Sequence, residues 1–154
     1  MTASNDVPSC YHNVVLAYNG SECGRRALRE GAELARRCGA HAHLLAVIQL
    51  PFGVSYGEGF SAEDMMRNEV ERAQTVLDEG IAELKGAGVT VNGYLRHGDP
   101  VAAIAGLARE TGADLVVVGH ERRDGLRRWW HTATGVTLLD QIACSLLVVQ
   151  ATPC

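Results

Sequence analysis

The chain contains several short runs in which nearly every residue is apolar, and these runs limit the folds that it can adopt. They cover residues 14–18, 43–48, 115–119 and 145–150, and a weaker run covers 89–95. A strand that is apolar at every position must be covered on both of its faces. Between the runs, apolar residues recur three and four positions apart, which predicts amphipathic helices. The chain is therefore expected to alternate strand and helix, as a doubly wound α/β sandwich around a parallel sheet.

Local signals mark where the helices begin and end. Ser21 and Asp99 are suited to cap helix N-termini, and Pro100 fits a first helical position. Gly39 is expected to end the first helix. The longest predicted helix begins near residue 62, and its apolar stripe is expected to face the core. That stripe consists of Met66, Val70, Ala73, Leu77, Ile81 and Leu84, and the neighbouring Met65 is placed in the core with it.

Composition excludes several classes of protein. The chain has 154 residues, which indicates one domain, and its net charge of −4 gives no general attraction for nucleic acid. No apolar run approaches the roughly 20 residues of a membrane helix, so no membrane partner is expected. Residues 1–12 are predicted to be a polar tail without a signal peptide. The five cysteines show no metal-binding or redox spacing, which suits a reducing, cytoplasmic location. They are Cys10, Cys23, Cys38, Cys144 and Cys154.

Ligands of such sheets bind beyond the carboxyl ends of the strands. The segments that follow strands here are residues 19–21, 47–51, 97–99 and 119–134. None of them contains a dinucleotide-binding glycine motif, a P-loop or a nucleophile elbow. No base and nucleophile form a convincing pair either, so no catalytic residue is predicted and the chain is not expected to be an enzyme.

Several weak motifs acquire meaning through their order. Asn19-Gly20-Ser21 follows the first strand, Gly98-Asp99-Pro100 opens a later helix, and apolar strands at 115–119 and 146–149 close the chain. In this order the chain resembles the universal stress protein family over residues 13–150. The resemblance implies a five-stranded parallel sheet of order 3-2-1-4-5, as in adenine nucleotide α-hydrolase-like folds. It also implies a homodimer formed through the last strand, between Leu146 and Gln150, which such an order leaves at an edge.

Many family members bind ATP through the pattern G-x2-G-x9-G-[ST], whose glycines let backbone N–H groups close on phosphate. Laid on this chain, the pattern falls on Gly119, Arg122, Thr132 and Ala133, so three of the four positions depart from it. Asn19 also stands where relatives commonly carry Asp. These departures predict a stress-response protein that does not bind ATP in the usual way, with no certain cofactor.

An altered adenine-nucleotide site is the alternative, for AMP, ADP or ATP. Arg122, Arg123, Arg127 and Arg128 would then meet phosphate, with a hydroxyl from Thr132 or Thr134. By resemblance, Val47 would face the adenine. The predicted lining of such a site is Tyr18, Asn19, Val47, Gly98, Gly119, Arg122, Thr132 and Thr134.

The Arg-rich segment ends in Trp129 and Trp130, the only tryptophans of the chain. It is either a solvated loop or a docking segment, over residues 122–130, for a protein partner or a small anionic ligand. A chain that serves only as an interaction module, with an empty pocket, is a further possibility. His97 and His120 follow strands but lack a ligand pattern, so no metal is predicted. His41 and His43 are expected to be structural.

Overall fold

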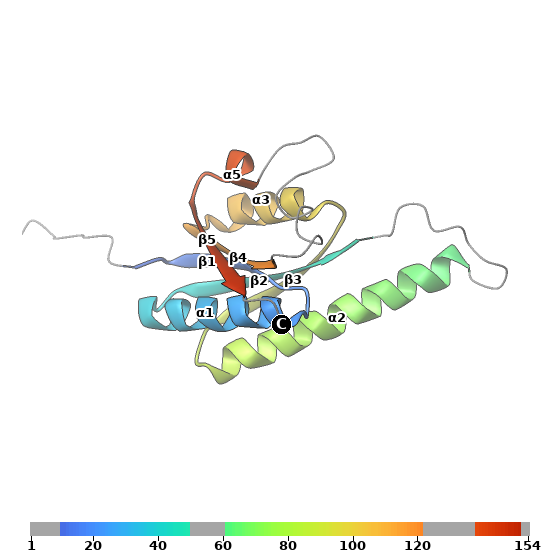
Figure 1. Ribbon diagram of the computed structural model, residues 1–154, viewed down its shortest axis with the longest axis horizontal. Coiled ribbons are helices and arrows are strands. Elements are labelled where there is room, and N and C mark those ends of the chain that lie inside the picture. Colours follow the sequence, from blue (N-terminus) through green and yellow to red (C-terminus); the bar gives the residue numbers. More distant parts are fainter. Residues whose placement is uncertain (1–9, 50–60, 122–137, 152–154) are drawn as a thin grey trace, which may run out of the picture.

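The structure is a computed structural model that describes residues 10–49, 61–121 and 138–151. These residues form one parallel sheet in the order β3-β2-β1-β4-β5 (Figure 1). The strands are β1 (Asn13–Ala17), β2 (His41–Ile48), β3 (Val91–His97), β4 (Leu115–Glu121) and β5 (Ser145–Ala151). The helices are α1 (Glu22–Cys38), α2 (Ala62–Gly86), α3 (Pro100–Thr111) and the short α5 (Leu138–Gln141). The predicted doubly wound sheet and its strand order are confirmed.

Helices cover both faces of the sheet. Figure 1 shows α1 and α2 on one face, with α3 and α5 on the other. Successive residues of a strand point to opposite faces, so β1 sends Val14 and Leu16 towards α1 and α2, and Val15 towards α3. All three are essentially inaccessible to solvent. This two-sided burial is the reason that the strands are apolar at every position.

The predicted helix caps are present. The Ser21 hydroxyl accepts a hydrogen bond from the N–H of Gly24 at 2.9 Å, and Asp99 accepts one from Ala102 at 2.9 Å. Gly39 and Gly112 end α1 and α3 in the left-handed conformation, both at φ 62°. A glycine adopts this conformation without the steric cost that other residues incur.

Two sequence predictions need correction. The third strand spans Val91–His97 rather than 89–95, because Val89 still belongs to the turn, where its N–H bonds the carbonyl of Leu84. The apolar stripe of α2 is buried only at Leu77 and Leu84, and Met65, Met66 and Val70 are partly exposed.

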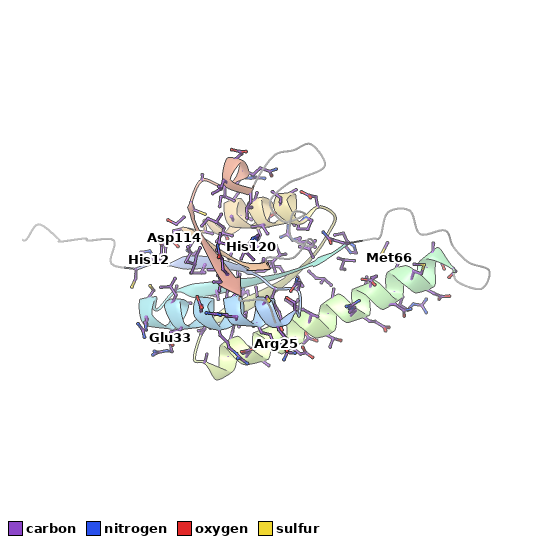
Figure 2. All side chains as sticks on the ribbon, viewed as in Figure 1. His12, Arg25, Glu33, Met66, Asp114 and His120 are labelled. Atoms are coloured by element: carbon purple, nitrogen blue, oxygen red, sulfur yellow. The ribbon has the colours of Figure 1, made fainter. Side chains whose placement is uncertain are left out.

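Length explains the exposed half of α2. A helix of 25 residues is about 37 Å long, whereas the eight residues of β2 span about 26 Å. Figure 2 shows Met66 near the end of α2 that reaches beyond the sheet.

Glycines set the distance between the helices and the sheet. A Cβ on Gly31 of α1 would lie 2.3 Å from Leu16 Cδ2, and one on Gly80 of α2 would lie 2.6 Å from Leu44 Cδ2. Real Cβ atoms essentially never come so close to another atom. Glycine at these two positions therefore lets both helices rest directly on large leucines of the central strands.

Within the described ranges, no helix is both long enough and apolar enough to cross a membrane.

Candidate functional site

The candidate site lies at the carboxyl edge of the sheet, where strand order reverses around β1. In the sheet, β2 lies on one side of β1 and β4 lies on the other side. The connection after β1 therefore leads to one side and the connection after β3 leads to the other, and open α/β sheets bind ligands at such a point. The loop after β1, the end of β2, the turn before α3 and the end of β4 therefore surround one region.

Asn19 organises the loop that follows β1. Its Oδ1 accepts hydrogen bonds from the Ser21 N–H at 3.1 Å and from the Ser21 hydroxyl at 2.7 Å. That hydroxyl in turn caps α1 at Gly24. A Cβ on Gly24 would lie 2.6 Å from the same Oδ1, so the loop has no space for a larger residue at that position. The side-chain oxygen of Asn19 thus accepts hydrogen bonds from within the loop. The amide NH2 of the same exposed side chain can donate a hydrogen bond to a ligand.

Tyr18 points into the core on the side of α1 and α2. Its side chain is 3% exposed. The ring would contact a Cβ on Gly80 of α2 at 3.1 Å, and Arg25 of α1 lies beside the phenol, which raises the pKa of the guanidinium. The predicted site residue Tyr18 therefore supports the loop from below, and its backbone N–H bonds Leu45 at 3.0 Å.

Val47 and Gly98 lie on neighbouring strands at the same edge. Val47 is partly buried and packs with the α3 side of the core, which is the face opposite to Tyr18. Gly98 follows β3 with φ 107°, and its N–H bonds the carbonyl of Ile48 at 3.1 Å. The structure thus places Val47, Gly98 and Asn19 around the edge, with Tyr18 on the opposite face.

Gly119, the one glycine of the nucleotide motif that this chain keeps, lies against α1. A Cβ there would lie 3.2 Å from the carbonyl oxygen of Cys23 and 3.3 Å from Cβ of Ala27. Either contact is tighter than nine in ten real Cβ contacts, and the nearer atom belongs to the backbone of α1, which would have to move by a few tenths of an ångström. Packing of α1 on β4 therefore accounts for glycine at this position whether or not a ligand binds.

The remaining motif positions lie outside the described residues. They are Arg122, Thr132, Ala133 and Thr134, together with Arg123, Arg127, Arg128, Trp129 and Trp130. Predictions about phosphate contacts and about the docking segment 122–130 accordingly stay predictions.

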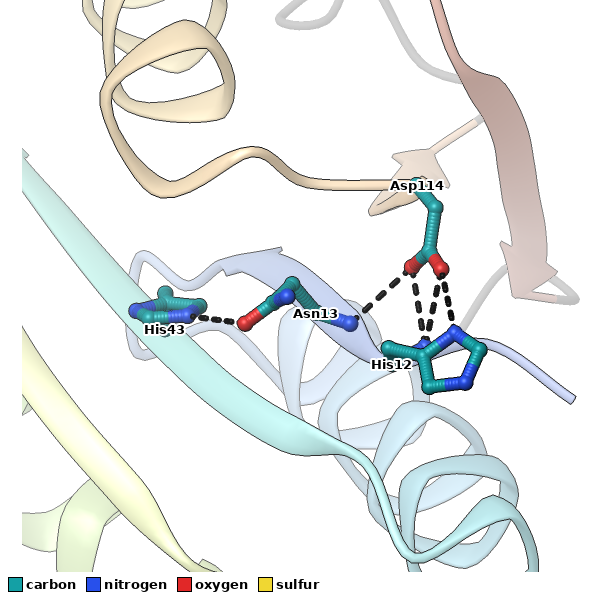
Figure 3. Close-up of polar contacts among 4 residues, drawn as sticks. All are labelled: His12, Asn13, His43 and Asp114. Carbon is teal, nitrogen blue, oxygen red and sulfur yellow. Dashed lines mark hydrogen bonds and ion pairs between the residues drawn. The ribbon is translucent and has the colours of Figure 1, made fainter.

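The opposite, amino edge of the sheet carries a polar network that the sequence did not reveal (Figure 3). The Asp114 carboxylate accepts from the backbone N–H of His12 at 2.8 Å and from that of Asn13 at 3.0 Å, across 102 and 101 residues of sequence. Burial opposes ionisation of Asp114, but these hydrogen bonds outweigh it and hold its pKa below the usual value.

The network continues to the histidines of β2. Asn13 Oδ1 lies 3.2 Å from Nε2 of buried His43, and the Tyr94 hydroxyl lies 3.1 Å from Nδ1. Burial lowers the pKa of His43, with a smaller effect from neighbouring His41. These contacts fit the structural role expected for the pair.

Across the three described stretches, no three His, Cys, Asp or Glu side chains are grouped to hold a metal ion. His97 is exposed beside Gly98.

Fold and edge together define an open α/β protein with a candidate binding region at the reversal of strand order. The chain belongs to the universal stress protein family, whose model matches residues 11–150.

Known proteins resemble the chain over almost its full length. Universal stress protein Sll1388 of Synechocystis is 24% identical over 153 residues, which cover 91% of this chain and 98% of that protein. A solved universal stress protein from Burkholderia pseudomallei superposes with a TM-score of 0.72 and 25% identity, and covers 93% of this chain and 98% of its own. An AMP-bound family member from Arabidopsis thaliana has a TM-score of 0.65, 18% identity and 92% coverage of both chains. Other solved relatives contain cAMP or dAMP.

Proposed function

We propose that this chain is a cytoplasmic, non-enzymatic homodimer that acts in a stress response and does not hold ATP through the usual family motif. The observation that carries the proposal is the environment of Gly119. A Cβ at this position would lie only 3.2 Å from the Cys23 carbonyl oxygen, which is a packing reason for glycine that needs no phosphate. The other three motif positions are occupied by Arg122, Thr132 and Ala133, which depart from the family pattern. None of the four positions therefore holds a residue that can be explained only by ATP binding.

The loop after β1 supports the same proposal. Asn19 commits its oxygen to Ser21 and presents an amide NH2. An aspartate at this position would add a carboxylate with acceptors only, so the two residues select different ligand groups. An Asn here favours a ligand atom that accepts a hydrogen bond.

A second candidate is an altered site for a nucleoside monophosphate. Relatives contain AMP, dAMP or cAMP, which carry a single phosphate. Val47 offers an apolar surface at the edge, and the Asn19 amide offers donors suited to ring nitrogens of a base. In this candidate, Arg122 and Arg123 replace backbone N–H groups as phosphate ligands through guanidinium hydrogen bonds.

Thermal unfolding with added nucleotides separates these functions. A nucleotide at 100 times its Kd stabilises a native protein by about 2.7 kcal/mol, which raises the Tm of a domain of this size by about 5–10 °C. We expect no such shift with millimolar ATP and magnesium, and no ATP released on denaturation of the purified protein. A shift with AMP or cAMP alone would establish the second candidate, and a shift with ATP would contradict the proposal.

A matched variant tests the motif itself. The triple change Arg122→Gly, Thr132→Gly and Ala133→Ser restores the family pattern. We expect it to gain an ATP-dependent rise in Tm that the wild type lacks. A variant that restores only Ala133→Ser keeps the bulky residues at 122 and 132 and is the control, for which no gain is expected.

The homodimer is proposed from the edge position of β5. The N–H and C=O groups on its outer side have no strand beside them within the described sheet. Leu146, Leu147 and Val148 are only partly buried in the single chain. Pairing of β5 with β5 of a second copy, from Leu146 to Gln150, would cover these residues through a twofold interface.

Substitution of Val148 by Asp is expected to convert the dimer to monomer, because a charge would enter the apolar interface without a partner. Val91→Asp is the matched control, since Val91 is also a partly buried valine but lies on β3, the opposite edge strand. Light scattering measures the mass of each variant. A Val148→Asp protein that keeps the dimer mass, or a Val91→Asp protein that loses it, would reject pairing through β5.

A further inference from the structure

Two cysteines that are far apart in sequence meet at the amino edge of the sheet. β1 and β2 pair in parallel with Asn13 opposite His41, so the segment that precedes β1 lies next to the turn that precedes β2. The backbone N–H of His41 bonds the carbonyl of His12 at 2.8 Å, which ties the segment before β1 to the turn after α1. Cys38 is the last residue of α1, directly before that turn.

The two thiols are neighbours and both are accessible. Cys10 and Cys38 are each partly exposed, as free thiols. The Cys38 side chain acts on Cys10 as a hydrogen-bond partner and as a like charge, and both effects raise the pKa of Cys10.

We propose that Cys10 and Cys38 are an oxidation site that forms a reversible intrachain disulfide when the protein meets a hydroperoxide. The thiolate of one of the two cysteines attacks one oxygen of the peroxide, the O–O bond breaks, and hydroxide leaves, which gives a sulfenic acid on that cysteine. The sulfur of the other cysteine then attacks the oxidised sulfur and displaces the hydroxyl group, which departs with the proton of the second thiol as water. In sum, two thiols and one hydrogen peroxide give one disulfide and two waters.

The other described cysteines are less suited to this reaction. Cys23 is 4% exposed inside α1. Burial raises the pKa of Cys144, and the charge of Asp114 raises it further, so its thiolate is disfavoured. The pairing is therefore specific to the segment before β1 and the end of α1.

The disulfide would close a loop that contains all of β1 and α1. Closing a loop of this length removes entropy from the unfolded chain. The oxidised protein is therefore expected to melt on the order of 10 °C higher than the reduced one. The disulfide would also fix the segment directly before β1 against the sheet, beside the contact of His12 with Asp114. A disulfide between partly exposed thiols is expected to be readily reduced again.

The experiment treats the purified full chain with a small excess of hydrogen peroxide and maps its peptides by mass spectrometry without reduction. We expect one linked peptide pair that contains Cys10 and Cys38, a loss of two hydrogens from the intact mass, a higher Tm, and reversal by dithiothreitol. Cys38→Ser and Cys10→Ser should each abolish the link, whereas Cys144→Ser should leave it intact.

Several results would overturn the proposal. They are a link that involves another cysteine, a disulfide between two copies, and sulfinic acid on Cys10 or Cys38 without any link. Peptide mapping of the wild type shows whether the Cys10–Cys38 link forms, even if a serine variant fails to fold. This mapping does not depend on nucleotide binding, so failure of the proposed function would leave its result interpretable.

Discussion

Substitution of Gly31 by Ala is expected to destabilise the protein by about 1–3 kcal/mol, although alanine is the better helix former. The new Cβ would lie 2.3 Å from Leu16 Cδ2 and 3.5 Å from Val117 Cγ1. Both side chains are 1% exposed, so Leu16 can move away only by displacing other packed side chains. Either this repacking or a shift of α1 away from the sheet loosens contacts around the new methyl group. Urea unfolding followed by circular dichroism measures the loss.

Gly106→Ala is the matched control for this prediction. Gly106 lies in the interior of α3, and a Cβ there would meet no atom within 4 Å. The same substitution should stabilise the protein there by about 0.5–1 kcal/mol through helix propensity alone. Opposite signs at the two positions are the expected result. A Gly31→Ala protein as stable as the wild type would show that α1 is not in direct contact with Leu16.

Replacement of Asp114 by Ala is expected to cost about 1–2 kcal/mol, because two backbone N–H groups at the start of β1 lose their acceptor. We expect a free-energy cost in the lower part of the range for hydrogen bonds to charged groups. The Asp114 side chain is 39% exposed, so water can partly take the place of the lost carboxylate. Unfolding in urea near pH 7 measures the effect. Asp78→Asn is the control, because Asp78 is an exposed residue of α2 whose bond to Gln74 lies within one helix turn.

The stability that Asp114 provides should depend on pH in a defined direction. Its pKa is lowered in the folded protein, so the contribution is fully present above the ordinary value and is lost as pH falls through the folded pKa. The difference in unfolding free energy between the wild type and Asp114→Asn should therefore shrink below about pH 4. Arg36 and Arg37 hold the pKa of Glu33 at about 2, so Glu33 also makes stability depend on pH. Because Glu33 is present in both proteins, its contribution cancels in this difference. A difference that stays constant down to pH 2 would contradict the assignment.

Much of the fold could be predicted because its signals are local. Ser21 and Asp99 cap helices by bonds to residues three positions on, and Gly39 ends α1 through its own left-handed backbone. Strands that are apolar at every position require cover on both faces, which fixes the sandwich. The order of strands was obtained from the resemblance to a family, whose model matches residues 11–150.

The candidate site was less predictable, because side-chain direction and spacing depend on the packed elements. Alternation along β1 sends Tyr18 into the core beneath α2, while Val47 faces α3. Gly119 is explained by the approach of Cys23 in α1, a contact that spacing within a motif does not reveal. The partial exposure of Met66 could not be predicted for a similar reason. A helical stripe indicates which face of α2 is apolar, but not where the sheet beneath it ends.

The class of fold, the helix ends and the departure from the nucleotide motif could be read from local patterns, since each depends on neighbouring residues. The contact of Asp114 with the segment before β1 and the approach of Cys10 to Cys38 became visible only in the folded chain. Both arise because parallel pairing joins segments whose separation in sequence is set by the intervening helices. No local pattern records which groups that pairing brings into contact.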